Sequence, residues 1–297
     1  MNTFKEKGYE VLYAPDLSYP ELITQVRNAE GLVVTTRLQI DKAVIDNAPQ
    51  LKWIGRLGSG MELIDTEHAA AKNIICISSP EGNRNAVAEH ALAMLLSFMN
   101  KLQKSCAEVK DGKWLRNENR GTEITGKTIG LIGYGNTASA FAKLLAAFDV
   151  SMLAYDKYKT GFSEKFIREA DIEHISRHAD VISFHVPLSK ETKYMADDSF
   201  FDKLRNKPFI INTSRGNVIE TTALIKALDQ NKISGAALDV LENENLETLS
   251  PLQKEQMDYL LNKDNVLITP HIAGYSHEAF YKMSTVLLSK LEAMKLL

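Results

Sequence analysis

Short apolar segments alternate with longer segments of helical spacing along most of this chain. The apolar segments predict strands at residues 11–13, 31–35, 53–56, 128–132, 152–155, 181–185, 209–212, 236–238 and 266–269. Strands that alternate with helices are typical of βαβ units, in which neighbouring strands run parallel. The pattern therefore predicts an α/β protein with mostly parallel sheets.

Two helical segments indicate the domain organisation. Residues 86–104 keep Val87, Ala91 and Met94 on one face and predict one long helix, and residues 278–297 predict a final helix. The strands after the long helix suffice for a doubly wound sheet, and we expect the final helix to return to the first domain. We therefore predict a discontinuous first domain, residues 1–86 with 273–297, and an inserted second domain, residues 87–272.

Composition limits the classes of function. Apolar residues make up 44% and charged residues 25% of the chain, as in ordinary globular proteins, and the net charge is -3, without a basic field for nucleic acid. Cys76 and Cys106 are too few for a disulfide scaffold and are not spaced as a metal site, which favours a reducing cytoplasm. No apolar run approaches the ~18 residues that span a bilayer. We expect no nucleic acid, membrane or metal as a partner.

A glycine-rich turn follows the strand predicted at residues 128–132. Gly133, Gly135 and Ala138 have the G-x-G-x-x-G/A spacing at the start of a helical segment, where main-chain amides favour a pyrophosphate. Asp156 ends the next strand, 23 residues after Gly133, at the distance expected of an acid that hydrogen-bonds ribose hydroxyls. An ordinary strand-to-helix turn also uses glycine. Strand, turn, helix and acid together predict a dinucleotide, with NAD preferred because Asp156 repels a 2'-phosphate.

Polar residues follow three further strands, at the positions where open α/β sheets bind ligands. Arg215 and His271 each follow a strand, and Glu244 comes five residues after Asp239 at the end of another. A guanidinium can hold a carboxylate through two hydrogen bonds, and a histidine with a carboxylate on its far nitrogen is a proton carrier at neutral pH. Taken singly, these residues fit equally well a surface arginine, a solvated glutamate and a structural histidine.

Taken together, these segments resemble the D-isomer-specific 2-hydroxyacid dehydrogenases, with the phosphoglycerate dehydrogenase branch nearest. The matching segments, in the same order along nearly the whole chain, are residues 130–138, 180–188, 212–216, 237–240 and 270–274. The resemblance implies two doubly wound parallel-sheet domains, a Rossmann NAD-binding domain inserted into a flavodoxin-like substrate domain. It implies that Arg215 binds the substrate's carboxylate and carbonyl, that His271 is the acid/base, and that Glu244 is its partner.

The resemblance also implies which residues surround the cofactor and the substrate. Those along NAD are Gly133, Tyr134, Gly135, Asn136, Thr137, Asp156, His185, Val186, Pro187, Thr213, Ser214, Arg215, Asp239, His271 and Gly274. Those at the substrate are Arg37, Gly58, Ser59, Gly60, Asn83 and Arg215. A simple glycine turn at residues 58–60 and a helix cap at Asn83 are the alternatives. A homodimer that associates through the nucleotide domains is implied as well.

The chain departs from the family pattern in four places. Residues 61–63 read Met-Glu-Leu where Val-Asp-Asn is usual, so we expect a different pocket wall. Thr35 replaces one of two arginines that bind phosphate in some members, so phosphorylated substrates should bind weakly or need Arg37. Met1 falls inside a helix that a strand usually precedes, so we expect a first domain with one strand fewer or a start site further upstream. Serine feedback through a domain after Leu297 is not expected.

The expected function is hydride transfer between a nicotinamide and C2 of a small D-2-hydroxy acid or 2-keto acid. D-3-phosphoglycerate oxidation is one candidate, and a glyoxylate, hydroxypyruvate or D-lactate type reductase is the alternative within this class. A corepressor-like protein that senses NAD is the alternative from another class, since one fold serves several functions. The presence of Arg215, Glu244 and His271 together disfavours sensing alone.

Overall fold

The chain forms two compact units in a computed structural model that describes residues 2–164 and 166–297. The first unit contains the chain up to Asn83 together with His277–Leu297, and the second contains Arg84–Ser276. Each unit has its own parallel sheet. The assignment of substrate to the first unit stays a prediction.

The helices and strands are as follows. The first unit contains α1 (Asn2–Glu6), α2 (Tyr19–Gln25), β1 (Gly31–Val34), α3 (Lys42–Asp46), β2 (Trp53–Arg56), α4 (Thr66–Ala71), β3 (Ile75–Ser78) and α12 (His277–Ala293). From α5 (Pro80–Met99) the chain enters the second unit, with α6 (Leu102–Lys110), β4 (Thr128–Ile132), α7 (Asn136–Leu145), β5 (Ser151–Tyr155), β6 (Ile167–Glu169), α8 (Ile172–His178), β7 (Val181–Phe184), α9 (Asp198–Asp202), β8 (Phe209–Asn212), α10 (Thr221–Asp229), β9 (Gly235–Leu238), α11 (Pro251–Leu261) and β10 (Val266–Ile268). Short 3-10 helices lie at Val26–Asn28, Ala146–Phe148, Gly216–Val218 and Leu246–Thr248.

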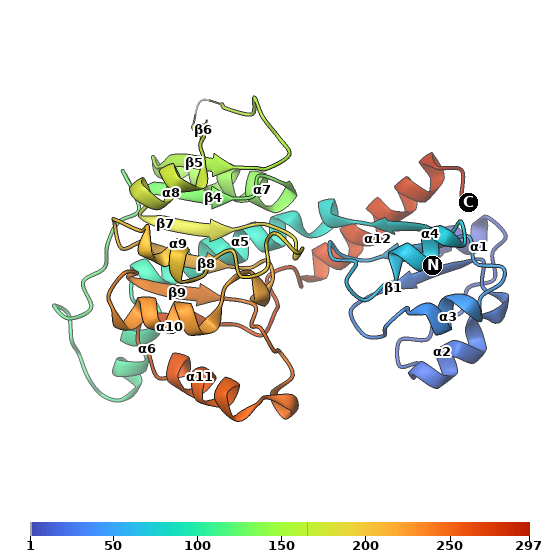
Figure 1. Cartoon of the computed structure of the whole chain (residues 1–297), viewed down its shortest axis with the longest axis horizontal. Coiled ribbons are helices and arrows are strands. Elements are labelled where there is room, and N and C mark those ends of the chain that lie inside the picture. The colour runs from blue at the N-terminus through green and yellow to red at the C-terminus, as the bar shows by residue number, and fades with distance from the viewer. Residues whose placement is uncertain (1, 165) are drawn as a thin grey trace. The chain divides into compact units, whose positions relative to one another are not determined.

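The strands of the second unit form one sheet in the order β10-β9-β8-β7-β4-β5-β6, which Figure 1 shows as a stack. All neighbouring pairs in it are parallel. This is the Rossmann strand order with one added strand. From β4 the chain adds strands first on one side, as β5 and β6, and then on the other side, from β7 onward, so the strand order reverses between β4 and β7. Ligands of such sheets bind at the carboxyl ends of the strands beside this point.

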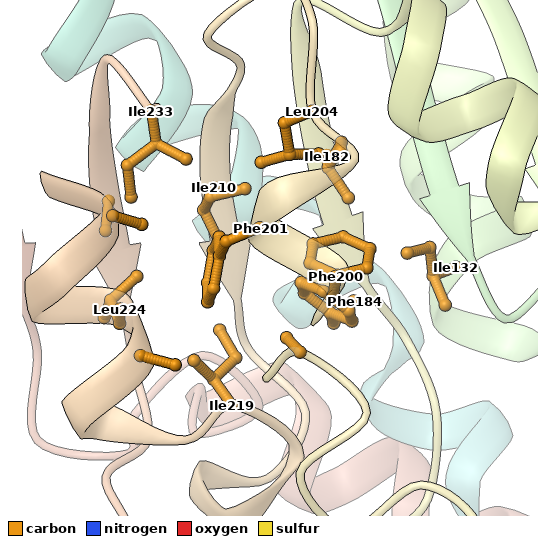
Figure 2. Close-up of a cluster of buried hydrophobic side chains, with 14 of the residues drawn as sticks. Ile132, Ile182, Phe184, Phe200, Phe201, Leu204, Ile210, Ile219, Leu224 and Ile233 are labelled. Carbon is orange, nitrogen blue, oxygen red and sulfur yellow. The ribbon is translucent and has the colours of Figure 1, made fainter. Parts of the chain in front are cut away.

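Alternate side chains of the strands enter two different apolar clusters, one on each face of this sheet. Ile211 of β8 packs in the cluster that contains α5 and α7. Its neighbour Ile210 packs in the other cluster, with Phe200 and Phe201 of α9 and Leu224 of α10 (Figure 2). A fully buried side chain of this kind contributes about 1.5–3 kcal/mol. Burial on both faces explains why these strands read as continuous apolar runs.

The sheet of the first unit has three parallel strands in the order β1-β2-β3. On one face, Met283 and Leu287 of α12 pack with Trp53 and Ile77. On the other face, buried side chains of α2, α3 and α4 form a separate cluster around Ile54. Both faces are therefore covered by helices, and the final helix belongs to the first unit.

Several expectations about elements are wrong. Residues 11–13 form no strand, and Leu12 and Tyr13 are 68% and 67% exposed, so neither side chain gains burial in a sheet. Residues 86–104 are not one helix, because Lys101 adopts a left-handed φ of 51° that ends α5 and starts α6. The strands β3 and β6 were not expected from the pattern. In β6 only Ile167 is buried, so this edge strand lacks the apolar run that would predict it.

Candidate active site

The turn after β4 leaves its main chain open to a ligand. Gly133 has a φ of 90°, and a Cβ built on it would lie 2.5 Å from the carbonyl oxygen of His185. Apart from Gly135 itself and its two chain neighbours, none of the described residues has an atom within 4 Å of a Cβ built on Gly135, the residue that precedes α7. Ala138 is fully buried, which lets α7 pack closely on the sheet. The open main chain and the helix amino terminus fit a pyrophosphate.

The carboxylate of Asp156 organises the end of β5 beside this turn. One oxygen accepts a hydrogen bond from the amide of Tyr134 at 2.9 Å. The other accepts from the amides of Tyr158 at 2.9 Å and Lys159 at 3.1 Å. Lys159 donates its ammonium to the carbonyl of Tyr134 at 3.0 Å. Asp156 therefore connects the turn after β4 with the turn after β5.

The imidazole of His185 links β7 to α7 inside the protein. Its Nε2 lies 2.9 Å from Ser183 Oγ, and its Nδ1 lies 3.2 Å from Thr137 Oγ1. Burial lowers the pKa of His185 to about 4, so the ring is neutral near pH 7. With both ring nitrogens engaged, a contact of His185 with a cofactor would run through its main chain.

His271 and Glu244 form a hydrogen-bonded pair after β10 and β9. Nδ1 of His271 lies 2.8 Å from Oε2 of Glu244, and both side chains are a little over two-fifths exposed. The hydrogen bond to Glu244 raises the pKa of His271, and partial burial acts in the opposite direction. Nε2 has no partner among residues 2–164 and 166–297. The pair therefore leaves one nitrogen for a ligand while the carboxylate fixes the other.

The buried carboxylate of Asp239 fixes the loop that carries His271. It accepts hydrogen bonds from the amides of Ile272 at 2.9 Å and Ala273 at 2.8 Å and from the hydroxyl of Thr269 at 2.5 Å. The amide of His271 donates to the carbonyl of Asp239 at 2.8 Å. His271 itself has a φ of 54°, a conformation that non-glycine residues adopt rarely and that recurs at active sites. Asp239 thus holds residues 269–273, and with them the strained backbone of His271, through hydrogen bonds.

The sequence interpretation missed two residues that support Asp239. The Oγ1 of Thr269 bonds to it, and Nε2 of His90 on α5 lies 3.0 Å from that hydroxyl and 3.6 Å from the carboxylate. A signal was present, because His90 lies between Val87 and Ala91 within the apolar stripe of the helix. A polar side chain at such a position needs a buried partner.

Arg215 emerges from a tight turn after β8. Asn212, which is 1% exposed, donates to the carbonyl of Arg215 at 2.9 Å and accepts from the amide and hydroxyl of Ser214. Nη1 of Arg215 donates to the carbonyl of Ser214 at 2.6 Å. The hydroxyl of Thr213 is buried and lacks a hydrogen-bond partner in the described part of the chain. Buried polar groups are normally satisfied, so this hydroxyl fits a site that a cofactor completes.

The residues expected at the substrate from the first unit lie as follows. Gly58 follows β2 with a φ of 143°, and a Cβ on it would lie 2.8 Å from the guanidinium of Arg56. Ser59 is exposed. Oδ1 of Asn83 is buried without a partner among the described atoms. Arg37 donates to the carbonyl of Leu17. Their role at a substrate stays a prediction.

Comparison with protein families identifies the class of this chain. The family model described as D-isomer specific 2-hydroxyacid dehydrogenase, NAD binding domain, matches residues 92–273. The chain belongs to the D-isomer specific 2-hydroxyacid dehydrogenase family, and its second unit carries the family's NAD-binding domain. The family predicted from the separated motifs is thereby confirmed, and so is NAD as the cofactor.

Individual relatives carry different names. The chain is 35% identical over 277 residues to a D-3-phosphoglycerate dehydrogenase of Archaeoglobus fulgidus, across 93% of this chain and 51% of that protein. It is 35% identical over 274 residues to a glyoxylate reductase of Thermofilum pendens, across 90% of this chain and 78% of that protein. The chain thus spans about half the length of the first of these relatives.

Solved structures share the fold. A D-lactate dehydrogenase of Aquifex aeolicus, complexed with NAD and lactic acid, matches with a TM-score of 0.81 at 30% identity, over 92% of this chain and 85% of that chain. A D-lactate dehydrogenase of Lactobacillus jensenii with NAD+ matches with a TM-score of 0.80 at 28% identity, over 99% and 91%. The predicted α/β architecture with a Rossmann domain is confirmed.

No helix in the described part of the chain is long and apolar enough to cross a membrane. The same residues bring together no group of three or more His, Cys, Asp and Glu side chains that could hold a metal ion.

Proposed function

We propose that this chain is an NAD-dependent D-2-hydroxyacid dehydrogenase that interconverts a small 2-keto acid and the corresponding D-2-hydroxy acid. The observation that carries the proposal is the 2.8 Å contact between His271 Nδ1 and Glu244 Oε2. Because all strands of this sheet are parallel, the pair lies at the same edge as the turn at Gly133. An acid/base pair at the edge that binds the dinucleotide suits a dehydrogenase.

His271 is the proton carrier in this proposal. Glu244 accepts the hydrogen bond from Nδ1, which stabilises the imidazolium and leaves Nε2 to donate a proton to the substrate oxygen. Arg215 holds the substrate carboxylate and offsets the negative charge that develops on the C2 oxygen. When bound, the reduced nicotinamide supplies the hydride that adds to C2.

The second unit supplies the residues that hold NAD. The amides at the start of α7 and the turn at Gly133 and Gly135 hold the pyrophosphate, and Asp156 bonds to the ribose hydroxyls. The hydroxyl of Thr213 and the carboxylate of Asp239 complete the nicotinamide end. Gly58, Ser59, Gly60, Asn83 and Arg37 of the first unit are proposed substrate contacts on the family resemblance alone.

Steady-state NADH oxidation with a panel of 2-keto acids tests this function. The panel contains glyoxylate, hydroxypyruvate, pyruvate and phosphohydroxypyruvate, so it also separates the substrate classes of the named relatives. We expect turnover with at least one unphosphorylated acid and weak binding of the phosphorylated one. Binding of NADH without turnover of any acid would instead support an NAD-sensing protein.

A homodimer and a cytoplasmic location complete the proposal. The exposed apolar side chains that support a homodimer are Leu102 and Val109 of α6 and Trp114 and Leu115 after it, of which Trp114 is 78% exposed. In this proposal they form one apolar surface, which is typical of an interface. Cys76 and Cys106 are both free thiols, which supports a reducing compartment.

A further inference from the structure

A hydrogen bond between Tyr194 and Glu242 joins two loops at the catalytic edge of the sheet. The hydroxyl of Tyr194 donates to Oε2 of Glu242 at 2.6 Å, and the amide of Thr221 donates to Oε1 at 2.7 Å. Tyr194 lies in the loop before α9, and Thr221 begins α10. Because Glu242 precedes Glu244 by two residues, both contacts hold the segment that carries Glu244.

Tyr194 occupies a backbone conformation that its side chain does not favour. Its φ is 54°, in the left-handed region where glycine and asparagine are preferred. The amide of Tyr194 donates to the carbonyl of Asn217 at 2.7 Å, which holds the residue in place. In this conformation the hydroxyl of Tyr194 lies within hydrogen-bond distance of Glu242.

The same segment packs against the turn of Arg215. A Cβ on Gly216 would overlap the carbonyl of Leu241, so the two main chains are in direct contact. Asn217 donates from its side chain to the carbonyl of Glu242 at 3.5 Å. On the other side, Asn243 donates to Oε1 of Gln253 in α11 at 3.3 Å. Residues 241–243, which precede Glu244, are therefore held by contacts with the loop before α9, with the turn and helix start after β8, and with α11.

The charge of Glu242 does not act on His271 directly. The groups that shift the pKa of His271 are Glu244, Arg215 and Asp239, together with burial. Glu242 is not one of them, so an influence of Glu242 on His271 would run through the position of Glu244. The hydrogen bond to Glu242 also raises the pKa of Tyr194 to about 12, which keeps the hydroxyl a donor at any ordinary working pH.

We propose that Tyr194 and Glu242 are positioning residues that set Glu244 against His271. They contact neither the reacting atoms nor the pair itself, and they act by restricting the loop between β9 and α11. The inference rests on the proposed function for its kinetic consequence but not for its structural one. Tyr194→Phe and Glu242→Ala should therefore change His271 while leaving the NAD-binding turn as it is.

The test is an NMR pH titration of His271 in the purified full chain, with the resonance assigned by its loss in His271→Asn. In Tyr194→Phe and Glu242→Ala, the pKa of His271 should fall, because Glu244 no longer holds the imidazolium as firmly. Turnover of the keto acid at neutral pH should drop about ten-fold, the scale of one lost hydrogen bond, with NADH affinity changed less than about two-fold. Glu242→Gln keeps an oxygen for Thr221 and an amide for Tyr194, so it should restore the parent titration.

Tyr259→Phe is the matched control. It also removes a tyrosine hydroxyl that bonds to a carboxylate, that of Asp229, on the surface formed by α10 and α11. An unchanged His271 titration in both Tyr194→Phe and Glu242→Ala would overturn the inference, and so would an equal shift in Tyr259→Phe. If the parent chain turns over none of the keto acids, the proposed function fails, yet the titration still decides the positioning role. Thermal unfolding of each variant identifies any that does not fold, and the remaining variant carries the test.

Discussion

Two histidines of this chain acquire opposite properties from their neighbours. Glu244 raises the pKa of His271, whereas burial lowers the pKa of His185 to about 4. One ring is therefore suited to carry a proton near neutral pH, and the other stays neutral and structural. Both histidines follow strands of the same sheet, so only their contacts distinguish His271, the proposed acid, from His185, which has a structural role.

Removing the charge of Glu244 should weaken the acid. Reduction of a keto acid requires protonated His271, so activity is present below its pKa and is lost as pH rises through it. Glu244→Gln keeps the shape but lowers that pKa, and the alkaline limb of kcat should move to lower pH.

His271→Asn should cost about 10²- to 10⁴-fold in kcat, the usual scale of general acid catalysis.

NADH affinity, measured by fluorescence, serves as the control for both variants. It should survive both changes, which separates loss of chemistry from loss of fold. An unchanged pH profile in Glu244→Gln would contradict the pairing, and parental turnover in His271→Asn would exclude this histidine as the proton carrier.

Asp156 should determine the choice of cofactor. Two like charges about 4 Å apart in a partly exposed site disfavour each other by about 1–4 kcal/mol, so NADH should be used well ahead of NADPH. Asp156→Asn removes the charge at nearly constant shape and should narrow the ratio of the two kcat/KM values. Equal kcat/KM for both cofactors in the parent chain would refute this role.

At the scale of elements, His185 joins α7 to β7 and makes their association sensitive to acid. Its pKa is about 4 in the folded chain, against 6.5 as the ordinary value. Between these values the unfolded chain binds a proton that the folded chain does not, so stability falls as pH falls from 6.5 to 4. The full effect is about 3 kcal/mol.

Urea unfolding at pH 7 and pH 4.5 measures this contribution. His185→Gln keeps two hydrogen-bonding groups without a titratable ring, so it should lose less stability on acidification than the parent chain does. His271 contributes with the opposite sign but equally in both proteins. Identical losses in parent and variant would show that His185 is not the source.

Strands buried on both faces of a sheet were predictable from the sequence. Features that depend on a local backbone conformation or on residues distant in the chain were not. The strand that ends at Ile132 combines an apolar run with a glycine turn, and the structure has it at the predicted bounds. Residues 11–13 are also apolar, but they form no strand and two of their side chains are exposed. The break at Lys101 depends on a local backbone conformation that no periodicity reveals.

The candidate site divides in the same way. Gly133 and His271 lie in short motifs that a sequence displays directly. Tyr194 and Glu242 are separated by 48 residues and belong to no motif, so their hydrogen bond could be found only from the structure. Glu244 was found through its spacing from Asp239 within a resemblance, and its distance to His271 came from the structure.

At the scale of the whole molecule, the second unit contains both the dinucleotide turn and the acid/base pair. The exposed apolar surface on α6 and the segment after it lies in this unit too. Association through that surface would place the oligomer contact on the unit that binds NAD.

If the proposed homodimer uses this surface, Trp114→Ser should weaken it. A large exposed aromatic side chain at an interface commonly contributes 2 kcal/mol or more, roughly a thirty-fold change in dissociation constant. Light scattering after gel filtration should show a lower mean mass at equal concentration. Tyr281→Ser is the control, because Tyr281 is 74% exposed on α12 of the first unit. A monomeric parent chain, or equal effects of both substitutions, would refute the proposed surface.

The central claim is hydride transfer to C2 of a 2-keto acid, and isotope transfer tests it most directly. The chain is incubated with a keto acid and NADH in which both hydrogens at C4 of the nicotinamide are deuterium, and the product is analysed by mass spectrometry and on a chiral column. We predict one deuterium at C2 of the D-2-hydroxy acid, and loss of this product in His271→Asn. Product without deuterium, the L-enantiomer, or no product from any keto acid of the panel would contradict the account.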